Sequence, residues 1–258
     1  MAAVARPITG FGSWVTPVSE NPPNETIAST LAPPIVVATS GLRTPRAAAV
    51  AGIAFGVLYV LSTVVLTIRP PDGVGPGEFA DWYRTTASTN LTVVSLYLTP
   101  FAGIAFLWFV AVIRSRVGER EDRFFATVFI GSGLLFVAMM WAAGAVAASL
   151  VATSRFDGTG VPDPATFESV RSLAQAFFYV YATRASAIFV IVTSTIALGT
   201  ATYPRWLVVL GYVIAVVQFF SVGLLEITVL LFPAWVVILS VWILGSEARA
   251  RRAVTPAN

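Results

Sequence analysis

Residues 206–244 read WLVVLGYVIAVVQFFSVGLLEITVLLFPAWVVILSVWIL, an apolar stretch of 39 residues with a single charged side chain, Glu226. As one α-helix this stretch would measure roughly 58 Å, about twice the ~30 Å hydrocarbon core of a bilayer. The chain must therefore turn back, and the turn is predicted near 223–226, where Gly223 and Glu226 fall mid-way. The result is two shortish membrane spans, the second of which contains Pro233.

Four further apolar segments precede this stretch, and each is long enough to cross a bilayer as a helix. They cover residues 47–68, 91–113, 124–152 and 176–198. Pro100 is expected to kink the second of them because a proline ring removes one helical hydrogen bond. The predicted fold is all-α, a polytopic transmembrane bundle of six spans over residues 44–246. In the first span Ala48, Gly52 and Gly56 recur every four residues, which favours close helix packing.

Composition supports a membrane protein and excludes much familiar chemistry. Apolar residues make up 57% of the chain and charged residues 11%, and the mean hydropathy is +0.81. Cysteine and histidine are both absent, which excludes disulfides, thiolate nucleophiles and Cys/His metal sites. Phosphate-binding loops and nucleophile elbows are also missing from the sequence. We therefore predict no catalytic residue, no metal and no cofactor, and we expect no nucleic-acid partner.

The distribution of arginine predicts the orientation. With six spans and both termini in the cytoplasm, the inner segments hold eleven arginines, namely Arg6, Arg43, Arg46, Arg114, Arg116, Arg120, Arg123, Arg205, Arg249, Arg251 and Arg252. A five-span alternative would place the last three outside. Every basic residue is arginine and none is lysine, which is typical of a GC-rich bacterium. The expected location is the bacterial inner (cytoplasmic) membrane, as a multi-pass protein.

Two tails flank the predicted bundle. Residues 1–43 are rich in Pro, Ser and Thr without a sustained apolar period, which predicts a disordered cytoplasmic tail with no evident signal peptide. Residues 247–258 form a short basic cytoplasmic tail. On the outer side, Asp163 followed by Pro164 is typical of a helix N-cap, so a short surface helix is expected before the fourth span.

Arg184 lies inside the fourth span and is the most informative single residue. An arginine at membrane depth is costly unless it faces protein, water or a partner. Its side chain could reach the outer headgroups, pair with Glu226, or form an anion or headgroup site with Gln218 and Gln175 as polar neighbours. These three interpretations remain open from the sequence.

A compact charged loop connects the second and third spans. It alternates charge sign through Arg114, Arg116, Glu119, Arg120, Glu121, Asp122 and Arg123. The arginines alone suffice as a topology anchor. The added carboxylates allow internal ion pairs or docking of a cytoplasmic protein partner, although exposed ion pairs contribute little stability.

Several motifs resemble those of a group of uncharacterised bacterial six-span integral membrane proteins. They are Leu107-Trp108-Phe109, GEREDRFFATVF at 118–129, GSGLLF at 131–136, IVTST at 191–195 with Pro204-Arg205-Trp206, and FPAW at 232–235 with Val241. The resemblance covers roughly residues 44–246. It implies a six-span bundle in a bacterial inner membrane, and it implies nothing about a substrate.

Function is predicted only as a choice among classes. The first hypothesis is a small-solute transporter or an anion- or lipid-binding membrane protein, motivated by Arg184 and by Pro100 and Pro233, which could break helices around a cavity. The alternative is a structural or regulatory membrane subunit. An intramembrane enzyme comes third. The expected partners are the lipid bilayer, an anionic solute or lipid, and a protein partner or a second copy of the chain.

Overall fold

The computed structural model describes residues 44–87, 90–117, 123–155, 160–201, 203–221 and 226–254. Within these ranges the chain is helical and contains no strand, which confirms the all-α class. The expected tail at 1–43 lies outside the described residues. The expected C-terminal tail begins as helix, because the last helix continues to Val254.

The main helices contain the predicted apolar segments and extend beyond most of them. They are α1 (Thr44–Thr63) with the 3₁₀ turn η1 (Val64–Thr67), α3 (Asn90–Val117), α4 (Arg123–Arg155), α6 (Thr183–Thr200), α7 (Arg205–Phe220) and α8 (Leu231–Val254). A 3₁₀ helix, η5 (Glu226–Leu230), precedes α8. The turn predicted near 223–226 lies mostly outside the described residues. Pro233 lies in the first turn of α8, where a missing N–H is tolerated.

Helix length separates two classes of apolar element. Four helices in the described ranges are long and apolar enough to cross a membrane, at Leu96–Arg114, Phe124–Ala152, Pro164–Thr200 and Ile227–Ser246, which suggests a membrane protein. The apolar segments at Ala49–Thr63 and Arg205–Phe220 are shorter. At 1.5 Å per residue α7 measures about 24 Å, less than the ~30 Å of hydrocarbon.

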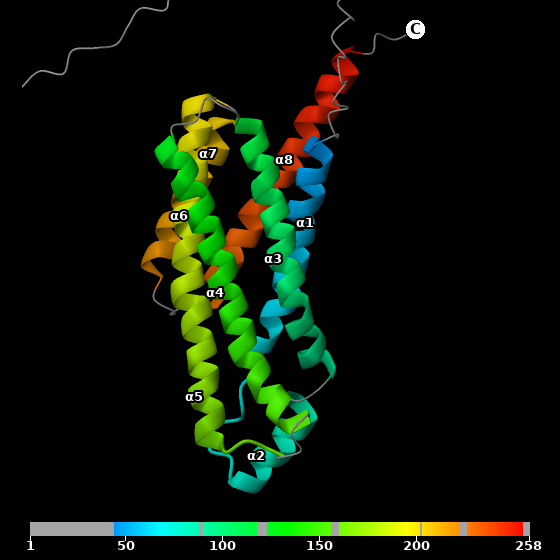
Figure 1. Cartoon of the computed structure of the whole chain (residues 1–258), viewed down its shortest axis with the longest axis vertical. Helices are drawn as coiled ribbons and strands as arrows, with labels where there is room; N and C mark the ends of the chain where they lie inside the picture. Colours follow the sequence, from blue (N-terminus) through cyan, green and yellow to red (C-terminus); the bar gives the residue numbers. More distant parts are fainter. Residues whose placement is uncertain are drawn as a thin grey trace, which may run out of the picture. The chain divides into compact units, whose positions relative to one another are not determined.

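The two ends of the bundle differ in charge. At one end α1 begins, α8 ends, and the chain passes from α3 to α4 and from α6 to α7 (Figure 1). We call this the arginine end because Arg114, Arg205 and Arg249 are exposed on the helix termini there. At the opposite end, the α2 end, lie α2 (Pro76–Trp82), the π-helical turn η2 (Tyr83–Ala87) and α5 (Pro164–Gln175). The described chain there carries Asp72, Glu78, Asp81, Asp163 and Glu168, together with Arg69, Arg84 and Arg171.

The short helix expected before the fourth span is present and is continuous with it. The Asp163 carboxylate caps α5 by accepting hydrogen bonds from the amides of Ala165 (3.1 Å) and Thr166 (3.3 Å), as predicted. The π-helix η4 (Ala176–Ala182) then joins α5 to α6, giving one helix of 37 residues. At about 56 Å this helix is longer than a bilayer core, so its polar α5 part projects beyond the apolar part.

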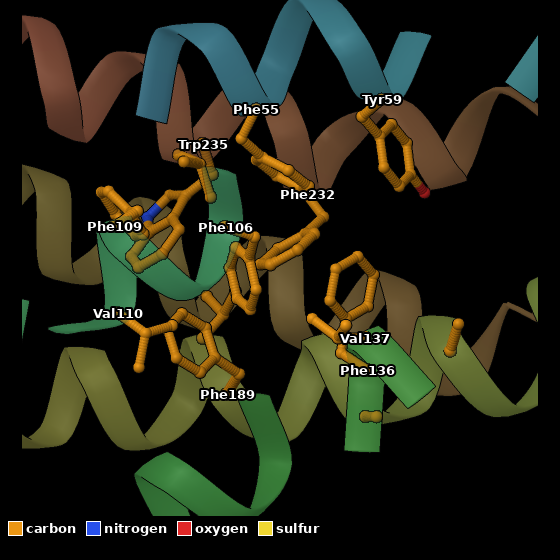
Figure 2. Packing of buried hydrophobic residues seen from close by; sticks show 14 of the residues in the cluster. Phe55, Tyr59, Phe106, Phe109, Val110, Phe136, Val137, Phe189, Phe232 and Trp235 are labelled. Carbon is orange, nitrogen blue, oxygen red and sulfur yellow. The ribbon is translucent and has the colours of Figure 1, made fainter. Parts of the chain in front are cut away.

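The centre of the bundle is a cluster of aromatic rings from five helices (Figure 2). It comprises Phe55 of α1, Phe106 of α3, Phe136 of α4, Phe189 of α6 and Phe232 of α8, all at most 1% exposed. Phe106 lies between 5.0 and 5.5 Å, centroid to centroid, from each of the other four rings. Edge-to-face pairs at these distances stabilise beyond their buried area. Side chains therefore fill the bundle at the level of Phe106 and Phe232.

A second, smaller cluster closes the α2 end. Phe79 of α2, Tyr83 of η2, Leu150 of α4 and Phe167 of α5 are buried together. The Tyr83 hydroxyl donates a hydrogen bond of 2.6 Å to the Leu150 carbonyl, which fixes η2 against the end of α4. This cluster holds the short helices on the projecting ends of the long ones.

The small-residue stripe of α1 packs against other helices, as predicted. A Cβ atom at Gly52 would collide with Ser240 Oγ of α8 and lie 2.9 Å from the Phe109 ring of α3. A Cβ at Gly56 would collide with Val237 of α8. The side chain of Ala48 lies outside the described residues. Two of the three stripe positions therefore set how closely α1 approaches its neighbours.

Candidate functional site

Arg184 lies in the first turn of α6, directly after the π-helix, and is half-buried. Its Nη1 donates a hydrogen bond of 2.9 Å to the carbonyl of Val180, one turn earlier in the same continuous helix. The side chain of Glu226 lies outside the described residues, so the predicted ion pair stays a prediction. The backbone of Glu226 begins η5.

Polar side chains gather around the end of α7, at the level of Arg184. Gln218 of α7 is 1% exposed, and its Oε1 accepts a hydrogen bond of 3.5 Å from Ser186 of α6. The hydroxyls of Ser221 and Thr228 lie 3.1 Å apart and join the end of α7 to η5. Because Ser186 is two residues from Arg184, the structure brings Gln218 to the part of α6 that carries the arginine.

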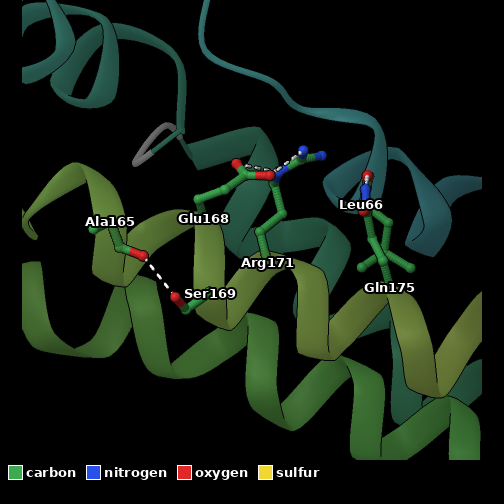
Figure 3. Close-up of polar contacts among 6 residues, drawn as sticks. All are labelled: Leu66, Ala165, Glu168, Ser169, Arg171 and Gln175. Atoms are coloured by element: carbon green, nitrogen blue, oxygen red, sulfur yellow. Dashed lines mark hydrogen bonds and ion pairs between the residues drawn. The ribbon is translucent and has the colours of Figure 1, made fainter.

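Gln175 belongs to a different contact, at the α2 end (Figure 3). Its Nε2 donates a hydrogen bond of 3.2 Å to the Leu66 carbonyl of η1, which ties α5 to the end of α1. Nine residues separate Gln175 from Arg184 along one helix, a distance of about 13 Å. The described contacts therefore leave Gln175 apart from Arg184, and they join Gln218 to Ser186, two residues from Arg184, without joining it to Arg184 itself.

Another arginine at the α2 end is already paired. Arg171 of α5 donates from Nε (3.1 Å) and Nη2 (2.9 Å) to the two carboxylate oxygens of Glu168 (Figure 3). These residues lie on the polar α5, outside the apolar part of the helix that begins at Ala176. The hydrogen-bonded guanidinium holds the pKa of Glu168 below its usual value, against the opposing effect of burial. Two of the three guanidinium nitrogens of Arg171 are thus engaged by protein.

The charged loop predicted between the second and third spans lies mostly outside the described residues. Arg114 is described and is exposed near the end of α3. Nothing is described of the side chains of Arg116, Glu119, Arg120, Glu121, Asp122 and Arg123. Docking of a protein partner at this loop remains a prediction.

The largest described cavity is an apolar groove between α3 and α4, of about 410 Å³. We call it the α3–α4 groove. Its α3 wall is formed by Val93, Leu96, Tyr97, Thr99 and Pro100, and its α4 wall by Trp141, Gly144, Ala145, Ala148, Val151 and Ala152. The groove reaches the surface, since Tyr97 is 69% and Trp141 40% exposed. Its volume falls within the range of small-molecule sites, about 300–1,000 Å³.

Small residues create this groove. Gly103 allows the Trp141 indole to lie directly on α3, because a Cβ there would come within 2.7 Å of Trp141 Cε2. Gly144 faces Thr99, whose Cγ2 would lie 3.0 Å from an added Cβ. Ala145 and Ala148 continue the α4 wall with side chains too short to reach α3. Pro100 leaves the carbonyl four residues earlier without its helical donor, which favours a bend of α3 at the groove.

Part of the α3–α4 groove can be recognised in the sequence. Ala143, Gly144, Ala147 and Ala148 are recognisable as a small-residue face, which predicts helix packing. In the structure Ala143 and Ala147 are buried in the core, while Gly144 and Ala148 line the groove. The neighbouring helix decides which small residues pack in the core and which line the groove. The periodicity of the sequence does not contain that information.

Metal binding finds no support in the described part of the chain, where no group of three or more acidic residues is placed to hold an ion. Comparisons with protein-family models, curated proteins and solved structures gave no match for this chain. The site must therefore be interpreted from its own geometry.

Proposed function

We propose that this chain is a lipid-binding, multi-pass protein of the bacterial inner membrane that holds an acyl chain in the α3–α4 groove. The observation that carries the proposal is the groove itself. It is apolar, open to the surface, and formed by the two helices at Leu96–Arg114 and Phe124–Ala152, both apolar enough to cross a membrane. The medium around such helices is hydrocarbon, so a lipid tail is the occupant whose chemistry matches the lining.

The charge distribution supports six spans with both termini in the cytoplasm. Exposed arginines occupy the arginine end, whereas five acidic residues, Asp72, Glu78, Asp81, Asp163 and Glu168, lie at the α2 end. Positively charged segments favour the cytoplasmic side of a membrane. The α2 end, with its cluster of Phe79, Tyr83, Leu150 and Phe167, then projects on the outer side.

Lipid binding accounts for the cavities better than solute transport does. The aromatic cluster fills the middle of the bundle, and three other described cavities hold about 10 Å³ each, roughly the space of one water molecule. The α3–α4 groove is much larger and lies at the side of the bundle. A transported solute would need a path through the centre, whereas a lipid enters from the side.

A structural or regulatory subunit is the second candidate, in which a helix of a protein partner or second copy occupies the groove. Gly144, Ala145 and Ala148 favour it, because small residues allow a helix backbone to approach closely. Under either proposal, a bulky side chain placed in the groove should displace the molecule bound there. Loss of lipid supports lipid binding, and loss of a protein partner or second copy supports the structural role.

The test compares Ala145→Phe with Ala138→Phe, which lies two turns earlier on the same exposed face of α4 and does not line the groove. We expect native mass spectrometry of wild type and Ala138→Phe, purified in mild detergent, to retain bound lipid, and Ala145→Phe to lose at least half of it. Equal lipid in all three proteins would contradict lipid binding. Loss of a dimer or partner from Ala145→Phe, without loss of lipid, would support the structural role.

A further inference from the structure

Three helices meet closely at Gly211 of α7. A Cβ atom at this glycine would collide with Ser194 Oγ of α6 and lie 3.2 Å from Trp235 Nε1 of α8. Both polar atoms therefore point at the same piece of α7 backbone. Ser194 and Trp235 are each 2% exposed, so bulk solvent does not reach them. Figure 2 shows Trp235 beside Phe109, at the edge of the aromatic cluster.

Neither of these buried polar atoms has a hydrogen-bond partner in the described structure. Burying a donor without an acceptor costs free energy, and polar groups in protein interiors are therefore paired with protein or with ordered water. The indole N–H can only donate, whereas the serine hydroxyl can donate and accept. A molecule that accepts from Trp235 and donates to Ser194 would satisfy both.

Space for such a molecule lies beside them. A cavity of about 10 Å³ is lined by Ser194 and Trp235, together with Thr193, Tyr203 and Leu239. A single water molecule needs roughly 10–15 Å³ and two to four polar partners. The cavity is too small for an organic ligand, and the donor N–H of Trp235 repels a cation.

A second small cavity lies beside the first. It also measures about 10 Å³, shares Thr193, Ala197 and Tyr203 with the first and is bordered by the exposed Arg114. The two cavities are therefore neighbours.

We infer that a single ordered water molecule binds in the first of these cavities, accepts a hydrogen bond from Trp235 Nε1 and donates one to Ser194 Oγ. It bridges α6 to α8 beside α7. Gly211 is required because a Cβ atom there would displace Ser194 Oγ from its position in the bridge. This inference is independent of the lipid proposed in the α3–α4 groove.

The first test uses the sign of a stability change in the full-length protein in detergent. If water bridges the pair, Ser194→Ala leaves the Trp235 donor poorly satisfied, and Tm should fall by about 2–4 °C. Trp235→Phe should also lower Tm, and the double variant should lose less than the sum of the two. If the hydroxyl is merely unpaired, Ser194→Ala leaves Tm unchanged or raises it. That result, or strictly additive losses, would overturn the bridge.

The second test detects the water directly by radiolytic hydroxyl-radical labelling with mass spectrometry, which oxidises side chains next to bound water even when they are buried. Trp235 should be labelled several-fold faster than the equally buried Phe106 of the aromatic cluster, after correction for intrinsic reactivity. The excess should disappear in Gly211→Ala. Labelling of Trp235 no faster than that of Phe106 would overturn the water site.

Discussion

Arg184 shows how a charged side chain inside an apolar helix can use the backbone of its own helix as a hydrogen-bond acceptor. Its guanidinium donates to the Val180 carbonyl, within the π-helix that precedes it. This contact satisfies one nitrogen and leaves the others able to reach an anion, a headgroup or a carboxylate. The three interpretations of Arg184 that the sequence leaves open therefore differ only in what the remaining nitrogens bind.

We expect the paired arrangement, and Arg184→Ala should then lower the free energy of unfolding by about 1–3 kcal/mol. Arg184→Lys should restore only part of this, because an ammonium can replace the donor to Val180 but not the planar fork that a carboxylate or phosphate accepts. Glu226→Gln should lower stability as well. Thermal unfolding and binding of vesicles with anionic lipid measure these effects.

Full rescue by lysine, together with a silent Glu226→Gln, would reject the pair. The contact with Val180 and the position near the headgroups would then account for the residue.

The sequence does not predict the role of residues whose contacts depend on how the helices pack. Ser194 and Trp235 are uncharged and unremarkable within their own helices, and they become informative only because α6, α7 and α8 bring them to the same glycine. Arg184 was recognised because a charge inside an apolar segment is costly wherever it points. A single sequence thus reveals a residue whose burial costs free energy in any orientation. It does not reveal a cost that arises only from contacts between helices.

At the scale of elements, α5 depends on its N-cap. Asp163→Ala should reduce the free energy of unfolding by about 0.5–2 kcal/mol, since two amides at the start of α5 lose their acceptor. Hydrogen exchange of the first turn of α5 should accelerate in parallel. Asp163→Asn is the matched control, because an asparagine side chain can accept the same hydrogen bonds. Equal losses for the alanine and asparagine variants would show that charge, and not capping, stabilises this terminus.

Helix boundaries were predicted well where the sequence contains a breaker. Asp163 with Pro164 marks the start of α5, and α7 ends at Phe220, a few residues before the predicted turn. The continuity of α5 with α6 was not anticipated, because the change from polar to apolar residues at Ala176 resembles a boundary. Composition changes there without any residue that ends a helix, so the backbone continues through η4.

At the scale of the whole molecule, the orientation can be tested with single cysteines in a chain that has none. Thr166→Cys, exposed on α5, should react with a membrane-impermeant maleimide added to spheroplasts. Ser246→Cys, near the end of α8, should react only after the membrane is opened. The cysteine-free protein controls for background labelling. Labelling of Ser246→Cys in intact spheroplasts would support five spans, with the C-terminus outside.

The number of spans depends on the length of α7, which the amino-acid composition does not reveal. The sequence predicts six apolar spans, and the described chain has four helices that satisfy both length and hydropathy. Residues 206–244 had to be divided, and the division leaves α7 with 16 residues. The predicted count therefore depends on whether a bilayer accepts a helix of that length.

If α7 crosses the membrane, as the proposed six-span topology requires, the unequal lengths of α4 and α7 give the protein two hydrophobic thicknesses. The apolar part of α4, Phe124–Ala152, extends about 43 Å, whereas α7 extends about 24 Å. A lipid bilayer deforms to match each helix, so it must thicken or let α4 tilt on one side and thin on the other, at a cost of fractions of a kcal/mol per Å of mismatch. Such a protein favours the boundary between thick and thin regions of a membrane, where both of its sides are matched at once.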